Sequence, residues 1–370
     1  MSERRADKTT IADVARLAGV STATAGRVLG GYGYTSEEIR DKVKKSADML
    51  GYRPNLLARS LITGRSKTIG VVAGDMQSPF YASILRGISD VVRARGFGLI
   101  VTNSDESIDR ELEAVDLLRE KQADGIIIAP CDILKAQHLH DVVASGCPVV
   151  QIDRRVKGLK ADSVTVNGRQ AAHAAVTQMI LDGHSRIGVL AELEHGRYKN
   201  LNAFLHDRQH KKIDISSLYP SWQRLLGYIE AHEEAGIAFD PSLVAQVGSY
   251  SIDIARQHAI ALLTRENRPS ALFTTDGLMS AGAMLAISEL DFSIPQQLSV
   301  VCFDDLDWMS FFTPKLTAIR QPLLEVGEAA ARLVLERLDS ADRAQQDIVL
   351  HAEWQPRCSL ARHPGGSGRS

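Results

Sequence analysis

The sequence predicts a small all-α head followed by a larger α/β core of two lobes, each a doubly wound parallel sheet. Two patterns indicate this organisation. The first 50 residues contain three short stretches of helical periodicity, each beginning at a capping residue. From residue 68 the pattern changes, because short β-branched runs alternate with stretches of helical periodicity.

The composition is that of a globular chain whose two parts carry opposite charge. Its 370 residues are 44% hydrophobic and 24% charged, and no run of about 18 apolar residues could cross a membrane. The opening stretch MSERRADKTT lacks the apolar segment of a secretory signal, so we expect a cytoplasmic location. Residues 1–67 carry a net charge of +6, and the remaining 303 residues carry −8. The basic head therefore suggests contact with a polyanion, with a solvated charged face as the alternative.

Capping residues place the first two helices of the head. TIADVARLAGV opens with a capping-box pattern from Thr10 to Asp13 and ends at Gly19. STATAGRVL can begin a second helix at Ser21 after a short turn. We therefore expect two short helices joined at a corner.

A third helix is expected in TSEEIRDKVKKSADML, where Thr35 and Glu38 form a stronger capping-box pattern and Gly51 ends the helix. Its buried stripe consists of Ile39, Val43 and Leu50. Two short helices braced by a third form a helix-turn-helix, whose second helix lies in the DNA major groove. We assign this domain to residues 8–53.

The segment at residues 54–67 contains a helical pattern that is too short to be stable alone. NLLARSL, from Asn55 to Leu61, lies between Pro54 and Gly64, which prevent its extension. An isolated helix below about 12 residues is marginal in water. We expect a hinge helix and linker here that need outside contacts to fold.

The core is expected over residues 68–360. Its first strands are TIGVVAG, FGLIVTN, DGIIIAP and CPVVQID, which start near residues 68, 97, 124 and 147. A second set consists of RIGVLA (186–191), ALFTT (271–275) and LSVVCFD (298–304). We expect the chain to cross between the lobes near residues 165, 295 and 322, and residues 361–370 to form a disordered tail. A crevice at the carboxyl ends of the strands is where open α/β sheets bind ligands.

Four segments in this order resemble the LacI/GalR family of bacterial transcriptional regulators over about residues 10–360: TIADVARLAGVSTATAGRVL, GYRPNLLARSL, TIGVV and SVVCFDDLDWMSFFTPKLTAIRQP. The resemblance implies a DNA-binding head and a periplasmic-binding-protein-like core. It also implies a homodimer or tetramer that binds a pseudo-palindromic operator, with a small molecule in the core controlling the affinity. The family's tetramers use a C-terminal leucine heptad that the tail CSLARHPGGSGRS lacks, so we expect a dimer.

The resemblance implies DNA-contact residues in the head and the linker. Thr22 and Ala23 at the start of the second helix, and Arg27 near its middle, match positions that read bases, although Arg27 could also be a plain surface arginine. Gly26 departs from the family, which usually has serine there. Leu61 matches an apolar wedge between bases, the alternative being a linker whose leucines pack on the core. The other expected contacts, several of them to phosphates, are Thr10, Ser21, Thr24, Tyr32, Arg53, Asn55, Ala58 and Arg59.

The resemblance also implies an effector site between the lobes. Phe80 and Tyr81 match one aromatic wall, and Tyr250 matches the stacking residue of the other lobe. Polar groups that match effector contacts are Ser78, Asp153, Arg154, Arg224, Asp276 and Asp304. The Asp-Arg pair resembles ribose-type sugar-binding proteins and favours a pentose or ketohexose over a purine. An interlobe salt bridge or a buried structural tyrosine is the alternative for each of these residues.

One segment departs from the family. Where relatives have a short loop, about residues 192–222 intervene, and their histidines His195, His206 and His210 lack the Cys or carboxylate partners of a metal site. We therefore expect a solvated insertion and no metal.

The other function classes fit the sequence less well. A transport-type sugar-binding protein would explain the core but not the helix-turn-helix, and a Rossmann enzyme would need G-x-G-x-x-G where the chain has VVAGDMQSPF. We expect no cofactor and no catalysis. A purine-responsive regulator of the same family stays open.

Overall fold

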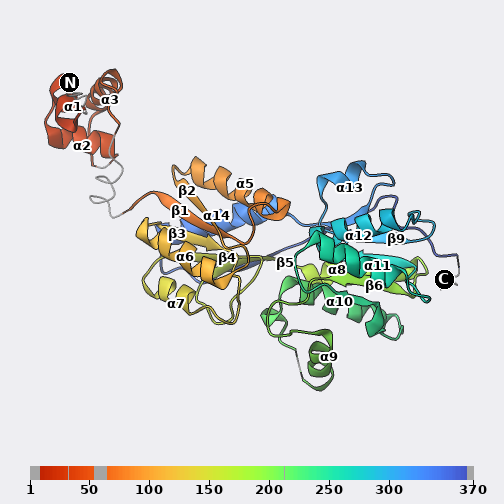
Figure 1. The fold of residues 1–370 in the computed structure, drawn as a ribbon. Helices are drawn as coiled ribbons and strands as arrows, with labels where there is room; N and C mark the ends of the chain where they lie inside the picture. Colours follow the sequence, from red (N-terminus) through yellow and green to blue (C-terminus); the bar gives the residue numbers. More distant parts are fainter. Residues whose placement is uncertain (1–8, 32, 54–64, 212, 365–370) are drawn as a thin grey trace, which may run out of the picture. The chain divides into compact units, whose positions relative to one another are not determined.

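The computed structural model describes residues 9–31, 33–53, 65–211 and 213–364 (Figure 1). It separates into a head unit, residues 1–68, and a core unit, residues 69–370. The two units are described separately.

The head contains three helices, α1 (Ile11–Ala18), α2 (Thr22–Gly30) and α3 (Glu37–Met49). The capping box between Thr10 and Asp13 is confirmed, and Gly19 ends α1 in the left-handed conformation at φ 68°. Ser21 is confirmed as the residue that caps α2. The helices pack around a small core of Val14, Ala15, Ala25, Val28, Val43 and Ala47.

The capping box expected at the start of α3 is wrong. Ser36, rather than Thr35, is the extended residue before the helix, and its hydroxyl accepts a hydrogen bond from the Ile39 amide. Glu38 instead forms an ion pair with Lys42 one turn later, at 3.1 Å. Thr35 and Ser36 both carry a hydroxyl group that could cap the helix. The residue nearer the helix, Ser36, is the one that does so.

The core consists of two six-stranded sheets, which confirms the predicted fold class. The first has the order β11-β5-β4-β3-β1-β2 and the second β12-β10-β9-β8-β6-β7. Neighbours such as β3 and β4 or β8 and β9 pair in parallel, whereas β10 and β12 are antiparallel. The strands are β1 (Thr68–Ala73), β2 (Gly98–Asn103), β3 (Gly125–Ile128), β4 (Val149–Ile152), β5 (Asp162–Val166), β6 (Ile187–Ala191), β7 (Val244–Gln246), β8 (Ala271–Thr274), β9 (Ser299–Phe303), β10 (Thr317–Arg320), β11 (Asp347–Leu350) and β12 (Glu353–Gln355).

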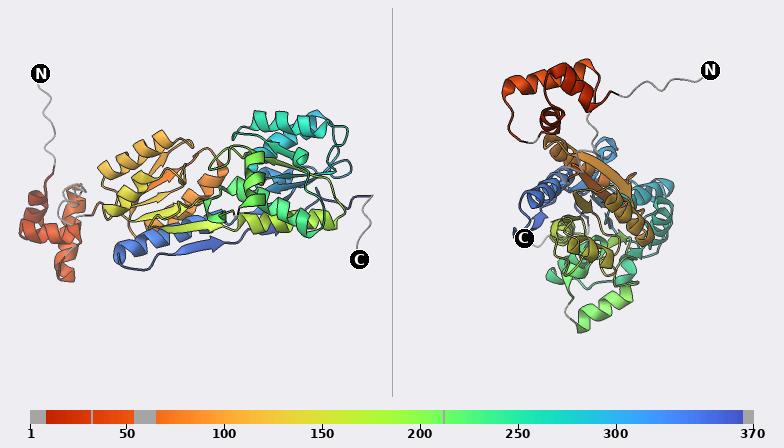
Figure 2. Two further views of the ribbon diagram at one scale, coloured as in Figure 1. Left: turned by 90° about the horizontal axis from the view of Figure 1, so that it is seen from below. Right: turned by 90° about the vertical axis from the view of Figure 1, so that its left-hand side faces the viewer.

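Helices cover both faces of each sheet (Figures 1 and 2). The first lobe has α5 (Pro79–Ala94) and α14 (Leu323–Asp339) on one face, with α6 (Ile108–Glu120) and α7 (Gln137–Ala144) on the other. The second lobe has α8 (Gly168–Leu181) and α10 (Pro220–Glu234) on one face, with α11 (Ile252–Leu263) and α12 (Gly277–Glu289) on the other. Shorter elements are α13 (Asp307–Phe311), η1 (Ile215–Ser217) and η2 (Pro241–Leu243).

Two glycines let α5 and α14 approach closely. A Cβ atom on Gly87 would lie 2.2 Å from the Leu324 carbonyl oxygen, and one on Gly327 would lie 2.1 Å from the Ile84 carbonyl oxygen. No side chain fits at either position. The pair therefore ties α14, which comes late in the chain, to the first lobe.

The chain passes between the sheets in three places, after β5, after β10 and after β11. The crossing expected near residue 295 is wrong, because β8 and β9 on either side of it pair directly within the second sheet. The last crossing, near residue 351, was not predicted. Asn167 joins it to the first crossing, since its side-chain oxygen accepts a hydrogen bond from the Ala352 amide at 2.8 Å.

The expectation that residues 192–222 form a solvated insertion is wrong. The segment contains α9 (Leu201–His210), and Tyr198, Phe204 and Trp222 are all buried in the second lobe's core. Their ring centroids lie 4.9 to 5.7 Å apart. The insertion therefore adds an aromatic layer to the second lobe, which stabilises it by apolar burial.

The expected start of the disordered tail at residue 361 is also wrong. The Ala361 amide donates to the Ser299 hydroxyl at 3.2 Å, and the His363 amide donates to the Asp182 carbonyl at 2.8 Å. These bonds hold residues 361–364 against the second lobe. Residues 365–370 lie outside the described part of the chain.

Candidate functional site

The exposed face of α2 carries the residues that the resemblance implied for base reading. Thr22, Ala23 and Arg27 are exposed, whereas Ala25 and Val28 on the opposite face are buried. The apolar face of α2 therefore packs against the other two helices, which leaves its polar face exposed.

The expected contacts around α2 include residues that already support the helix. Thr10 donates to the Asp13 carboxylate at 2.6 Å, and Ser21 accepts from the Thr24 amide at 3.1 Å. The Ser21 and Thr24 hydroxyls also lie 2.9 Å apart. Arg53 is exposed after α3. The other expected contacts lie outside the described residues: Tyr32, Asn55, Ala58, Arg59 and Leu61.

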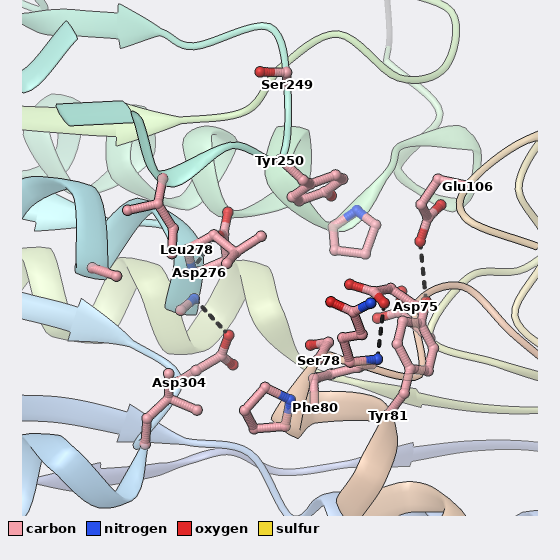
Figure 3. A pocket seen from close by; sticks show the side chains of 18 of the residues that line it. Asp75, Ser78, Phe80, Tyr81, Glu106, Ser249, Tyr250, Asp276, Leu278 and Asp304 are labelled. Atoms are coloured by element: carbon pink, nitrogen blue, oxygen red, sulfur yellow. Dashed lines mark hydrogen bonds between the residues drawn. The ribbon is translucent and has the colours of Figure 1, made fainter. Parts of the chain in front are cut away.

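A cavity of about 760 Å³ lies between the two lobes of the core (Figure 3). The turns that follow the carboxyl ends of the parallel strands contribute most of its wall, as expected for open α/β sheets. The structure brings together all nine residues predicted for an effector site: Ser78, Phe80, Tyr81, Asp153, Arg154, Arg224, Tyr250, Asp276 and Asp304.

The first-lobe wall is built on an ion pair. The Arg154 guanidinium contacts both carboxylate oxygens of Glu106, and it donates to the Pro130 carbonyl at 3.2 Å. Burial disfavours the Glu106 charge, but Arg154 nevertheless holds the pKa of this carboxyl below its usual value. The buried Tyr81 hydroxyl donates to Glu106 at 3.3 Å, and the Phe80 ring packs edge-on against Tyr81 at 5.0 Å. These contacts fix the wall before any ligand arrives.

Asp153 is adjacent to this pair and shares its cation. Its carboxylate lies 3.4 Å from the Arg154 guanidinium, which already contacts Glu106. Burial raises the pKa of Asp153. Its backbone has φ 64°, an unusual conformation for a non-glycine residue, as found at functional sites.

The second-lobe wall includes two carboxylates that organise the start of α12. Asp276 caps the helix, accepting from the Leu278 amide at 3.0 Å and the Met279 amide at 2.9 Å. Asp304 accepts from the Gly277 amide at 3.0 Å and the Gln321 amide group at 2.6 Å. Burial raises the pKa of Asp276 to about 6.

Arg224 is the cation of the second-lobe wall, and it is only 7% exposed. Its guanidinium lies 3.9 Å from the Phe303 ring centroid and donates to the Thr275 carbonyl at 2.5 Å. Among the described residues, its Nε has no hydrogen-bond partner. Arg224 also lines the cavity, where its guanidinium can bind a ligand oxygen.

Further lining residues were not predicted as effector contacts. Glu106 follows β2, His195 follows β6, Trp308 comes after β9 and Gln321 follows β10. Each of them lies after the carboxyl end of a strand, as Asp153 and Asp276 do. This position in the sequence could have predicted them as lining residues. The sequence singled out His195 only as a possible metal ligand. In the described ranges, no group of three or more His, Cys, Asp or Glu side chains could hold a metal ion.

The cavity combines apolar surfaces with an excess of carboxylates. Apolar contacts are available from Phe80, Tyr250, Leu278 and Trp308. The carboxylates are Asp75, Asp105, Glu106, Asp153, Glu194, Asp276 and Asp304, against the two guanidinium groups of Arg154 and Arg224. Such a cavity can bind paired hydroxyl groups and repels an anion.

Comparisons with known proteins agree with this architecture. The family model described as bacterial regulatory proteins, lacI family, matches residues 10–55. The model described as a periplasmic binding protein-like domain matches residues 176–360.

Named relatives match over nearly the whole chain. The HTH-type transcriptional repressor PurR of Vibrio atlanticus (strain LGP32) is 28% identical over 95% of this chain and 98% of its own length. Catabolite control protein A of Priestia megaterium is 30% identical over 89% of this chain and 92% of its own. The ribose operon repressor of Haemophilus influenzae (strain ATCC 51907 / DSM 11121 / KW20 / Rd) is 29% identical over 95% and 97%. Two of these relatives, PurR and the ribose operon repressor, are named as repressors.

A solved structure shows the same fold. The lac repressor dimer bound to operator and the anti-inducer ONPF is 23% identical, with a TM-score of 0.78 over 96% of this chain and all of that chain. In the described part of the present chain, none of the helices has the length and hydropathy needed to span a membrane.

The raised pKa of Asp276 predicts a pH-dependent stability of the ligand-free core. Because its pKa is about 6 in the folded protein and about 3.9 in an unfolded chain, the folded protein binds more protons between these values. The stability of the core therefore falls as the pH rises through that window. Asp276→Asn keeps the helix cap without the titration. The variant's free energy of unfolding relative to wild type should rise from pH 5 to 7.5 in denaturant titrations.

Asp240→Asn is the matched control, since hydrogen bonds from Ser242 lower the pKa of this capping carboxyl. Its titration lies below the tested range, so its relative stability should stay level. A level profile for Asp276→Asn as well would contradict the assigned environment of Asp276.

Proposed function

The chain belongs to the lacI family of bacterial regulatory proteins, and we propose that it is a transcriptional repressor whose operator affinity is controlled by a small sugar. The sugar is a monosaccharide of the ribose or ketohexose type, bound between the two core lobes. The observation that carries this proposal is a cavity to which each lobe contributes carboxylates, a guanidinium and aromatic surface. Such a ligand would couple its own binding to the arrangement of the lobes.

The charge of the cavity supports a neutral polyol. Carboxylates and guanidinium groups form paired hydrogen bonds with neighbouring hydroxyls, and Phe80 and Tyr250 offer apolar faces to the ring. A phosphate group would face the carboxylates of the cavity, Asp153 and Asp276 among them, which outnumber the guanidinium groups that line it. The ribose operon repressor of Haemophilus influenzae supports the same ligand class.

A purine-responsive regulator is the second candidate, favoured by the relative PurR of Vibrio atlanticus. A purine is also uncharged and could stack on Tyr250. It would leave more of the carboxylates without hydroxyl partners, which is costly in a desolvated site.

The proposed domain roles follow the sequence assignment: residues 8–53 bind DNA, residues 54–67 link the head to the core, and residues 68–360 bind the effector and dimerise. Dimerisation is supported by the lac repressor dimer, which shares the fold. Two heads would then read two half-sites of one operator. The protein would act in the cytoplasm, where the DNA is, and would not catalyse a reaction.

Arg27 is predicted to read a guanine through its exposed guanidinium. On an operator selected from random DNA with the full-length protein, Arg27→Ala should cost about 1–3 kcal/mol in binding free energy, and much less on unrelated DNA. Fluorescence anisotropy measures both affinities. Arg40→Ala, an exposed arginine on α3, is the control and should not change the preference for the operator. An equal loss on both DNAs for Arg27→Ala would reduce its role to a phosphate contact.

The ligand class is tested by thermal unfolding with matched probes. D-ribose or D-fructose should raise the melting temperature of the full-length protein, because a ligand stabilises the state that binds it. D-ribose 5-phosphate should give a smaller shift or none, since its phosphate meets the carboxylates. Stabilisation by hypoxanthine alone would replace the sugar with a purine, and stronger stabilisation by the phosphorylated sugar would overturn the charge argument.

A further inference from the structure

The insertion at residues 192–222 contacts the first lobe as well as its own. Its Asp214 forms an ion pair with Lys157 of the first lobe, with the oxygen and nitrogen 2.5 Å apart. Both side chains are well exposed, so this pair contributes little to stability. Tyr219, at the end of the insertion, makes the buried contact.

The Tyr219 hydroxyl bonds to two backbone groups of the first lobe. It donates to the Cys131 carbonyl and accepts from the Ile133 amide at 3.2 Å. Tyr219 is 2% exposed, and the Ile133 side chain packs in the core cluster of the second lobe. A hydrogen-bonded and an apolar contact therefore join the lobes at one place.

The first-lobe side of this contact is rigidly anchored. The Cys131 amide donates to the Glu111 carboxylate at 2.6 Å, and Glu111 is fully buried on α6. The other Glu111 oxygen lies 2.7 Å from the His138 imidazole on α7. Tyr219 therefore bonds to a loop that is fixed to two helices of the first lobe, so the contact restrains the lobe itself.

The Tyr219 ring also touches two residues of the cleft. The Arg154 guanidinium lies 5.1 Å from its centroid, and the His195 ring lies 5.9 Å from it. The His195 ring also stacks on Tyr250, with the two ring centroids 5.7 Å apart. Gly196 makes room for this ring, since a Cβ atom there would lie 2.6 Å from Tyr219. A continuous row of stacked groups thus runs from the first lobe to the second.

We propose that Tyr219 is a positioning residue that fastens the two lobes together and aligns Arg154 and His195 on either side of the cleft. Its hydroxyl fixes the separation of the lobes near the cavity, and its ring sets the orientation of the two cleft side chains. This contact between the lobes comes from the insertion, and its role does not depend on which effector the cleft binds. It gives the ligand-free core one preferred lobe arrangement.

Tyr228 provides a matched control for a purely structural role. It is 1% exposed, and its hydroxyl donates to the Ile187 carbonyl at 2.6 Å within the second lobe. Tyr219→Phe and Tyr228→Phe each delete one buried hydroxyl and keep the ring. Only the first deletion removes a bond between lobes.

The test follows backbone amide exchange in full-length protein without ligand, by mass spectrometry. In Tyr219→Phe, the amides of residues 131–133 should exchange about tenfold faster than in wild type, because Ile133 loses its acceptor and the lobes separate more often. In Tyr228→Phe, these amides should keep the wild-type rate. Ile133→Ala, which shortens the apolar anchor, should speed exchange at residues 214–219 in the second lobe.

The pKa of His195 tests whether Tyr219 positions this side chain. The His195 imidazole donates from Nδ1 to the Glu192 carboxylate at 2.5 Å, and this hydrogen bond raises the pKa of His195. Tyr219→Ala should release the ring from Glu192 and lower this pKa in NMR titrations, and Tyr219→Phe should restore the wild-type value. Wild-type exchange at residues 131–133 in Tyr219→Phe, equal acceleration in Tyr228→Phe, or an unchanged His195 titration in Tyr219→Ala would each overturn the proposal.

Discussion

The rest of the core depends on the parallel pairing of strands within its two sheets. Parallel strands end at one edge of a sheet, so each strand delivers the residues after its carboxyl end to the same place. The three crossings keep the two edges facing each other, and Asn167 joins two of these crossings through its bond to the Ala352 amide. The cavity is a consequence of this connectivity, because Asp153, Asp276 and their neighbours follow different strands and meet only through it.

Bringing these carboxylates together places several negative charges in one cavity, and the fold neutralises only some of them. Glu106 is neutralised by Arg154, and Asp304 is held by the Gly277 amide and the Gln321 side chain. Asp153 and Asp276 lack a comparable cation, and burial raises the pKa of both. Unbalanced buried charges of this kind lower stability, and they are concentrated at functional sites in proteins. The aromatic layer of the insertion and the close packing of α5 against α14 offset such costs elsewhere in the core.

Much of this could be predicted from the sequence, because local signals determine it. The cap at Thr10 and the β-branched runs of the inner strands are local, and the nine cavity residues were found from a family pattern tied to strand ends. Most of what failed depends on contacts between distant residues. The cap of α3 is the exception, because Thr35 and Ser36 offer the same local signal. The edge strands β7 and β12 have three residues each, too few for a periodic signal. The sequence favoured a solvated insertion because Tyr198, Phe204 and Trp222 are spaced without helical or strand periodicity. These three residues form a cluster only after folding.

The central claim is that the cavity controls the head, and operator affinity measured with and without sugar tests it most directly. Fluorescence anisotropy of operator DNA with the full-length protein should show an affinity change of about tenfold on adding saturating D-ribose or D-fructose. Arg224→Ala should bind the same operator as tightly as wild type and show no response, because its guanidinium lies in the cavity. A normal response in Arg224→Ala, or an operator affinity that no cleft ligand changes in wild type, would contradict the account.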